Sequence, residues 1–176
     1  QYTCLAYSKT HKLLFGVNTG TLRSCTVWNI QTKTVVETLK HSGGTIECVA
    51  CQGDHLITGG SDCAVHIYSL PSLSATYIIP QHGLPVSHVA LSKKLAVFAS
   101  IDVGHTLSLG FTDTGRIIAS KIIQCDLEAI HKFVILDEGY IVVTSFSQDA
   151  NEVSYTTLTV FDLRVERVAQ ETIQGE

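Results

Sequence analysis

One segment of the chain decides the fold: Leu56-Ile57-Thr58-Gly59-Gly60-Ser61-Asp62-Cys63-Ala64-Val65-His66-Ile67-Tyr68-Ser69-Leu70. An apolar run ends in two glycines, and a short polar turn follows it. After the turn the residues alternate, with Val65 and Ile67 expected to point inward and His66 and Tyr68 outward. A period of two on each side of a small-residue turn is typical of a β-hairpin. The segment therefore predicts two antiparallel strands.

The pattern of this hairpin recurs about four times along the chain. Trp28, Tyr68, Gly110 and Phe161 occupy one place in the repeat, at successive intervals of 40, 42 and 51 residues. The last interval is longest because segment 145–153 is expected to lengthen a turn, and segment 165–170 is the expected final strand. A repeat of roughly 40 to 45 residues with four strands is the period of a propeller blade. The sequence therefore predicts an all-β chain of four-stranded antiparallel sheets.

The repeats resemble WD40 repeats at the end of their third strand. Phe161-Asp162 stands where that family has its Trp-Asp pair, and Trp28-Asn29 and Tyr68-Ser69 are weaker forms of the pair. Segment 58–62 is similar to the family's small-residue turn before the third strand. The resemblance implies that residues 1–176 form a partial β-propeller, part of a ring of about seven blades. Its blades would cover approximately residues 2–44, 45–85, 86–128 and 129–170.

The same resemblance implies a structural network at the turn of the second blade. In WD40 proteins a His ahead of the first strand bonds the Asp of the following inter-strand turn. By this resemblance His41, Thr58, Asp62 and Tyr68 would stabilise that turn, with Tyr68 in place of the usual Trp. Removing one partner of such a buried set leaves the other unpaired, at a cost of roughly 1–3 kcal/mol.

The third blade is expected to carry a reduced form of this network. By the same resemblance His82 and Asp102 take the roles of His41 and Asp62. Gly110 stands in place of the aromatic residue, so the network is expected to be incomplete there.

Composition limits the classes of function that the chain can have. Its 176 residues are 45% hydrophobic and only 16% charged, as in a globular domain rich in buried strands. A net charge of −4 disfavours nucleic acid as a partner. No apolar run approaches the roughly 18 residues of a membrane span, so direct membrane insertion is not expected. The chain starts at Gln1 and has no Met, which favours an internal fragment. The expected location is the cytoplasm, with any association with membranes made through the parent protein.

The six cysteines include one close pair, Cys48-Val49-Ala50-Cys51. A zinc site would need a second close pair, and a redox motif would stand between a strand and a helix. This pair falls inside an expected strand with no second pair nearby, so all six, Cys125 included, are expected to be small buried thiols. The sequence therefore predicts no metal site and no cofactor.

Two hypotheses for function follow. No Gly-x-Ser-x-Gly, phosphate-loop or His-Glu-x-x-His motif is present, so the first is a non-catalytic scaffold that is not an enzyme. Its partners would be other proteins, or the remaining blades of the same polypeptide. The second is a propeller enzyme or small-ligand binder that uses the central channel. The residues expected to face that channel are Cys48, Ala50, His88 and Ala90.

Partner contacts are expected at Arg23, in a long loop, and at Trp28, because Arg and aromatic residues dominate interface hot spots. A second resemblance concerns the pathway. The segments VSHVALS (86–92), GRII (115–118) and FVILDEGYIVV (133–143) are similar to the C-terminal propellers of BEACH-domain proteins. That resemblance implies a scaffold in membrane traffic.

Overall fold

The computed structural model describes residues 2–18, 20, 23–123 and 129–174, which form sixteen strands in four sheets. The first sheet contains β1 (Tyr2–Ser8), β2 (Leu13–Asn18), β3 (Cys25–Asn29) and β4 (Thr34–Leu39). The second contains β5 (Ile46–Gln52), β6 (His55–Gly60), β7 (Val65–Ser69) and β8 (Ser74–Ile79). The third contains β9 (Val86–Ser92), β10 (Val97–Asp102), β11 (Thr106–Phe111) and β12 (Ile117–Ile122). The fourth contains β13 (Ala129–Leu136), β14 (Tyr140–Gln148), β15 (Ser154–Asp162) and β16 (Arg167–Gln174).

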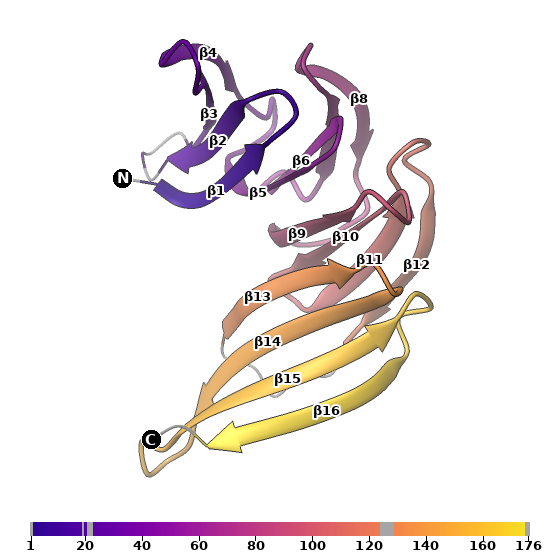
Figure 1. Ribbon diagram of the computed structural model, residues 1–176. Coiled ribbons are helices and arrows are strands. Elements are labelled where there is room, and N and C mark those ends of the chain that lie inside the picture. The colour runs from indigo at the N-terminus through magenta and orange to yellow at the C-terminus, as the bar shows by residue number, and fades with distance from the viewer. Residues whose placement is uncertain (1, 19, 21–22, 124–128, 175–176) are drawn as a thin grey trace.

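Each sheet is an antiparallel meander whose strands lie in chain order. Figure 1 shows the four sheets following one another along an arc, from the indigo first sheet to the yellow end of the fourth. The first strands of the sheets meet along one side, since β1 contacts β5, β5 contacts β9 and β9 contacts β13. This is the arrangement of consecutive propeller blades, and the predicted fold class is confirmed. No helix long and apolar enough for a membrane span occurs in the described residues.

Both faces of the second sheet are buried, which explains its sequence pattern. Leu56 and Tyr68 pack with the core of the first sheet, whereas Ile57 and Ile67 pack with Phe98 of the third. The prediction that His66 and Tyr68 point outward is therefore wrong: they are 4% and 5% exposed. Alternation along the strand separates two neighbouring blades here, rather than core from solvent.

The fourth sheet differs from its prediction at two places. The expected turn 145–153 is strand in its first four residues, because β14 continues to Gln148 and pairs there with Ser154 of β15. The expected final strand begins two residues later, at Arg167, and continues to Gln174. Residues 171–174, which lie beyond the expected strand, pair with β15.

Apolar side chains cover the outer face at each end of the arc. Phe15 and Val27 pack toward the second sheet, so their strand neighbours Leu14, Gly16 and Trp28 lie on the opposite face, here called the leading face. Tyr2 and Leu5 lie over Gly16 on that face, together with Trp28. On the outer face of the fourth sheet, here called the trailing face, the exposed large apolar residues include Val134, Leu136 and Tyr140.

Polar contacts join neighbouring blades at the hairpin turns that follow the innermost strands. Each turn contacts the corresponding turn of the next blade, so the contacts run along the whole arc. The three pairs are His11 Nε2 with Asp54 Oδ1 at 2.8 Å, Lys93 N with Gln52 Oε1 at 2.9 Å, and Ser92 Oγ with Asp137 Oδ1 at 3.0 Å.

Candidate functional site

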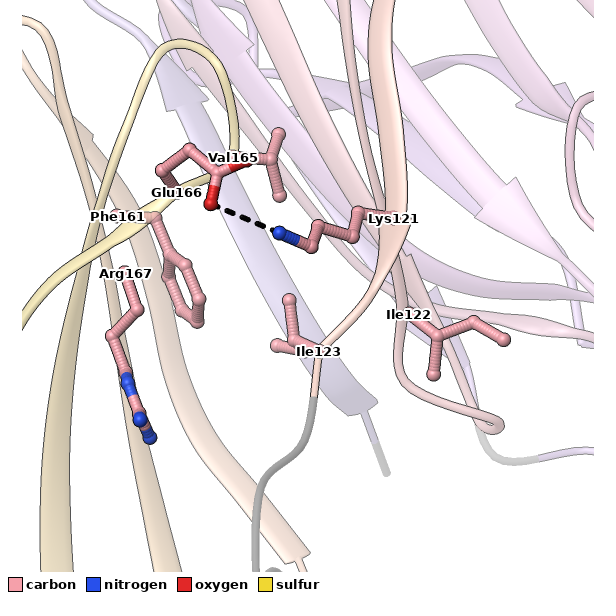
Figure 2. Close-up of a pocket in the computed structure, with 7 residues that line it drawn as sticks. All are labelled: Lys121, Ile122, Ile123, Phe161, Val165, Glu166 and Arg167. Atoms are coloured by element: carbon pink, nitrogen blue, oxygen red, sulfur yellow. Dashed lines mark hydrogen bonds and ion pairs between the residues drawn. The ribbon is translucent and has the colours of Figure 1, made fainter.

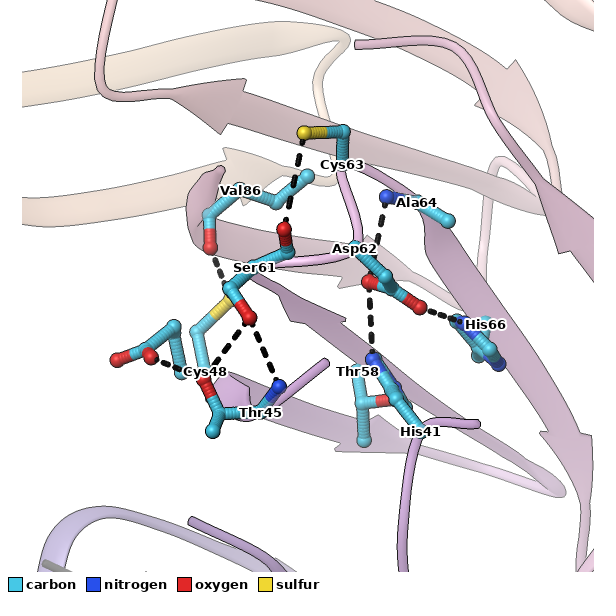
Figure 3. Close-up of polar contacts among 11 residues, drawn as sticks. His41, Thr45, Cys48, Thr58, Ser61, Asp62, Cys63, Ala64, His66 and Val86 are labelled. Atoms are coloured by element: carbon cyan, nitrogen blue, oxygen red, sulfur yellow. Dashed lines mark hydrogen bonds and ion pairs between the residues drawn. The ribbon is translucent and has the colours of Figure 1, made fainter. Parts of the chain in front are cut away.

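The densest group of titratable side chains lies at the β6–β7 turn of the second blade (Figure 3). His41 comes from the connection between β4 and β5, and its ring is completely buried. Its Nε2 lies 2.7 Å from Thr58 Oγ1, and its Nδ1 lies 3.1 Å from Asp62 Oδ1. Asp62 also accepts a long hydrogen bond of 3.4 Å from the backbone N–H of Ala64. Three of the four residues that the sequence placed in this network are thus bonded to one another.

His66 is the member that the sequence analysis missed. Its Nε2 lies 2.8 Å from Asp62 Oδ2, and its ring stacks on that of His41 with centroids 3.7 Å apart and planes at 14°. His66 stands directly opposite Thr58 in the β6–β7 register. The pairing of His66 with Thr58 could have placed His66 in the network from the sequence. It was missed because His66 was expected to point outward.

Tyr68 takes part through its ring. The ring lies nearly parallel to that of His66, at 16°, with centroids 6.3 Å apart. The other side of the cluster is therefore closed by an aromatic side chain that belongs to the core shared with the first sheet.

The charges of this cluster follow from its burial and hydrogen bonds. Burial, together with the neighbouring His66, lowers the pKa of His41 to about 4, and Asp62 offsets only part of this shift. Burial by itself would raise the pKa of Asp62, but hydrogen bonds from His66 and His41 outweigh it and lower that pKa. At neutral pH the cluster therefore contains a carboxylate and a neutral His41. When the N–H at Nδ1 of His41 donates to Asp62, Nε2 of His41 accepts a hydrogen bond from the Thr58 hydroxyl.

The third blade holds a similar group around His82. Its Nδ1 lies 3.0 Å from Asp102 Oδ2 and its Nε2 lies 2.8 Å from Ser100 Oγ. The second carboxylate oxygen accepts backbone N–H groups of Gly104 and Thr106, both at 2.9 Å. Ser100 was not predicted, although it follows Thr58 by 42 residues, one of the repeat intervals.

The third-blade group differs from the second at two positions. Ser108 stands opposite Ser100 in the register, where the second blade has His66, and it bonds Ser120 Oγ at 2.8 Å. Gly110 lacks the aromatic side chain, and Phe98 takes the space: a Cβ at Gly110 would lie 2.6 Å from its ring. The group lacks the aromatic member, as expected, yet retains its His–Asp and His–Ser hydrogen bonds.

The two expected partner residues have separate surroundings. Arg23 forms an ion pair with Glu47, and its guanidinium-bearing side chain is 43% exposed. Trp28 lies on the leading face, where its ring meets that of Tyr2 edge to face with centroids 5.2 Å apart. Trp28 occupies the repeat position of Tyr68, which is buried against the preceding blade.

The inner strands β1, β5, β9 and β13 line a wide hollow of about 730 Å³. The four predicted channel residues, Cys48, Ala50, His88 and Ala90, all line it. Burial lowers the pKa of His88, and His131 of the next blade adds to the shift. Burial raises the pKa of the Cys48 thiol and raises that of Cys51 to about 11, so both are protonated and unreactive at neutral pH.

Five cysteines are free: Cys4, Cys25, Cys48, Cys51 and Cys63. Cys125 lies outside the described residues.

A second, open hollow of about 480 Å³ lies between β12 and the β15–β16 hairpin (Figure 2). Lys121 Nζ and Glu166 Oε2 meet across it at 2.9 Å, and Phe161 and Ile123 form part of its wall. Both charged groups are more than half exposed, so this pair links two blades at a solvated surface.

The sequence and the structure of the chain were compared with those of known proteins. No protein-family model matches the chain. WD repeat-containing protein 18 of Homo sapiens is 24% identical over 141 residues, which cover 73% of this chain and 32% of that protein. The solved structure of U3-55K matches with a TM-score of 0.79 and 16% identity, over 99% of this chain and 52% of that one.

The chain thus spans about a third of the length of the curated relative and about half of the solved chain. Taken with the four sheets, these similarities show that the chain is built of WD40-type β-propeller blades. They give no support to a link with BEACH-domain proteins.

Proposed function

We propose that the chain is a segment of a larger WD40-type propeller and that it acts as a non-catalytic scaffold for other proteins. The observation that carries the proposal is that its buried polar side chains bond parts of the protein frame to one another. The buried clusters around His41 and His82 bond the turns of their own blades, and the contacts between hairpin turns bond each blade to the next. Such bonding gives a rigid frame on which exposed loops and outer strands can bind partners.

The leading and trailing faces support the larger ring. Leu5 on the leading face and Val134 on the trailing face are exposed, whereas the sheet faces that meet between neighbouring blades are buried. Open sheet faces of this kind are covered by further blades when a propeller closes. The greater length of the similar proteins agrees with this, and Trp28 is then a contact to the preceding blade.

Arg23 remains a proposed partner contact, since its charged end is accessible beside Glu47. The test uses the full-length protein that carries this chain. A protein partner identified by affinity purification is purified, and its dissociation constant is measured for wild type and for Arg23→Ala. Saturable binding by the purified pair supports the scaffold, and a rise in the constant of about tenfold assigns Arg23 to the interface.

The hollow of the inner strands favours one alternative, a small ligand held near His88 and His131. A screen of metabolites by thermal shift distinguishes the two functions, because a ligand that binds the folded state raises the melting temperature. A specific rise that is lost in His88→Ala, without any protein partner, would replace the scaffold proposal.

The cellular setting is also a proposal. The resemblance to BEACH-type propellers suggests a cytoplasmic scaffold attached to membrane traffic through its parent protein, without bound nucleic acid. Fractionation of cells tests this: the full-length protein should sediment with vesicles and remain there after nuclease treatment. Exclusive recovery with nucleic acid would contradict it.

A further inference from the structure

The hollow along the inner strands differs in charge from the rest of the protein. The chain has a net charge of −4, yet no Asp or Glu is among the described residues that line the hollow. Its basic lining residues are His88, His131 and Lys132, all from the third and fourth blades. We propose that these three residues bind the phosphate group of a small organic phosphate. Such a site is a specific form of the small-ligand alternative above, on which it rests, and it leaves the outer surfaces free for protein partners.

Shifts in strand register bring the basic side chains to the hollow. Each first strand contains one residue without a partner in the second strand, as in a β-bulge. The residues that directly follow these shifts all line the hollow: Cys4, Cys48, His88 and Lys132. In the fourth blade the residue without a partner is His131, and it lines the hollow beside Lys132. Thiols therefore face the hollow from the first two blades, and basic groups face it from the other two.

The hydrogen bonds of His88 determine which of its ring nitrogens carries the proton. The hydroxyl of Ser87 donates to the carbonyl oxygen of Ile101 at 3.1 Å, so its oxygen accepts from His88 Nδ1, also at 3.1 Å. Burial lowers the pKa of His88, and His131 adds to the shift, so the ring is neutral near pH 7. Nε2 of His88 then has a lone pair and forms no hydrogen bond to a described residue.

This arrangement favours a phosphate over a carboxylate. Lys132 supplies a positive charge and forms no ion pair with a described residue. Nε2 of His88 requires a donor. A phosphate monoester, whose second pKa is about 6, has charged oxygens that accept from Lys132, and its monoanion has an O–H that can donate to Nε2. An ionised carboxylate only accepts.

The acidic groups at the two ends of the inner strands are already bonded. Glu47, near the start of β5, pairs with Arg23. Asp137, which follows β13 at its other end, accepts a hydrogen bond from Ser92. Neither residue lines the hollow. No described carboxylate therefore opposes an anion between the two ends.

The rest of the hollow suits the organic part of the ligand. Its volume of about 730 Å³ is larger than a phosphate group needs and falls in the range of small-molecule sites. Ala50, Ala90 and Cys48 give it a wall without charge, since burial raises the pKa of the Cys48 thiol. An apolar group attached to the phosphate can pack on this wall.

Titration calorimetry of the full-length protein near pH 7 compares phenyl phosphate with benzoate, which has the same ring but a carboxylate. Phenyl phosphate should bind one to one, and about tenfold or more tightly than benzoate. Lys132→Gln and His88→Ala should each weaken phenyl phosphate by about tenfold or more. The matched control is Lys33→Gln, which removes the same charge from the turn between β3 and β4 and should leave the affinity unchanged.

Two results would overturn the proposal. One is phenyl phosphate that shows no saturable binding at millimolar concentrations, or that binds no more tightly than benzoate. The other is unchanged affinity in Lys132→Gln and His88→Ala, which would place the phosphate elsewhere. Circular dichroism checks folding, and the exposed Lys132 decides the matter if His88→Ala unfolds. Binding of a purified protein partner without binding of phenyl phosphate would remove this site and leave the scaffold proposal standing.

Discussion

The His41 ring is held neutral inside the protein, and this links its protonation to stability. Burial lowers its pKa to about 4, whereas an unfolded chain takes up the proton near its ordinary value of 6.5. As pH falls between these values, unfolding binds a proton and is favoured.

We therefore expect the free energy of unfolding to decrease by roughly 3 kcal/mol at most as pH falls from 7 to 4. Urea unfolding at a series of pH values measures this. His41→Gln, which cannot titrate, should show a smaller slope in that window, and an equal slope would assign the effect to other groups. Asp62 adds a loss only at lower pH, because its pKa is below its ordinary value of 3.8.

The carboxylate of Asp62 is bonded by two imidazoles and is largely buried, whereas that of Asp113 is mostly exposed and lies 3.3 Å from His55. Asp62→Ala should reduce the free energy of unfolding by about 2–3 kcal/mol, because it leaves two buried ring nitrogens without their acceptor. Asp113→Ala should change it by less than about 0.5 kcal/mol. Thermal or urea unfolding of both variants is the measurement, and equal losses would contradict a stabilising role for the cluster.

Among single residues, the sequence predicted those that its repeat resemblance could reach. His41, Thr58 and Asp62 were found because the small-residue turn resembles that of WD40 repeats. His66 and Ser100 were not, because their roles depend on which strand position faces the cluster. That information lies in the cross-strand register and in the burial of both sheet faces, which hydropathy alone does not give.

At the scale of the element, the β6–β7 hairpin depends on glycines where β6 ends. A Cβ on Gly60 would lie 2.0 Å from the carbonyl oxygen of Thr45 and 2.9 Å from His41 Nδ1. Strand β6, the backbone at Thr45 and the ring of His41 therefore meet at Gly60, where only a hydrogen atom fits in place of a side chain. Gly60 therefore allows close approach of the backbone, whereas Gly59 leaves room for the side chains of Val86 and Cys48.

Gly60→Ala should therefore destabilise the protein by about 1–3 kcal/mol, because the backbone of Thr45 must shift. The matched control is Gly83→Ala, where a new Cβ would meet nothing within 4 Å. Melting temperatures of the two variants test the difference. A similar decrease for both would mean that chain flexibility, rather than this contact, decides the effect.

The strand pattern was predictable in three blades and less so in the fourth. Short strands separated by turn residues predicted the sheets around residues 2–39, 46–79 and 86–122. The fourth sheet has strands of eight and nine residues, and Gln148 and Ser154 at its end are polar. Without alternating apolar residues, the sequence could not show that backbone pairing continues there.

At the scale of the whole molecule, the arc ends in two apolar faces that resemble its internal interfaces. Leu5 on the leading face is 62% exposed, although it packs over Gly16 beside Tyr2 and Trp28. If further blades close the ring, Leu5 is buried in the full-length protein. If the arc stands open, it remains at the surface.

Leu5→Lys separates these two states. In a closed ring the substitution removes buried apolar area and places a charge against the preceding blade, so the free energy of unfolding should fall by about 2 kcal/mol or more. Ile78→Lys is the matched control, because Ile78 lies exposed on the outer strand β8, and its effect should stay within about 0.5 kcal/mol. Urea unfolding of both full-length variants provides the comparison. Equal and small effects would mean that the leading face stays open, and the partner would then be sought on that face rather than on the loops.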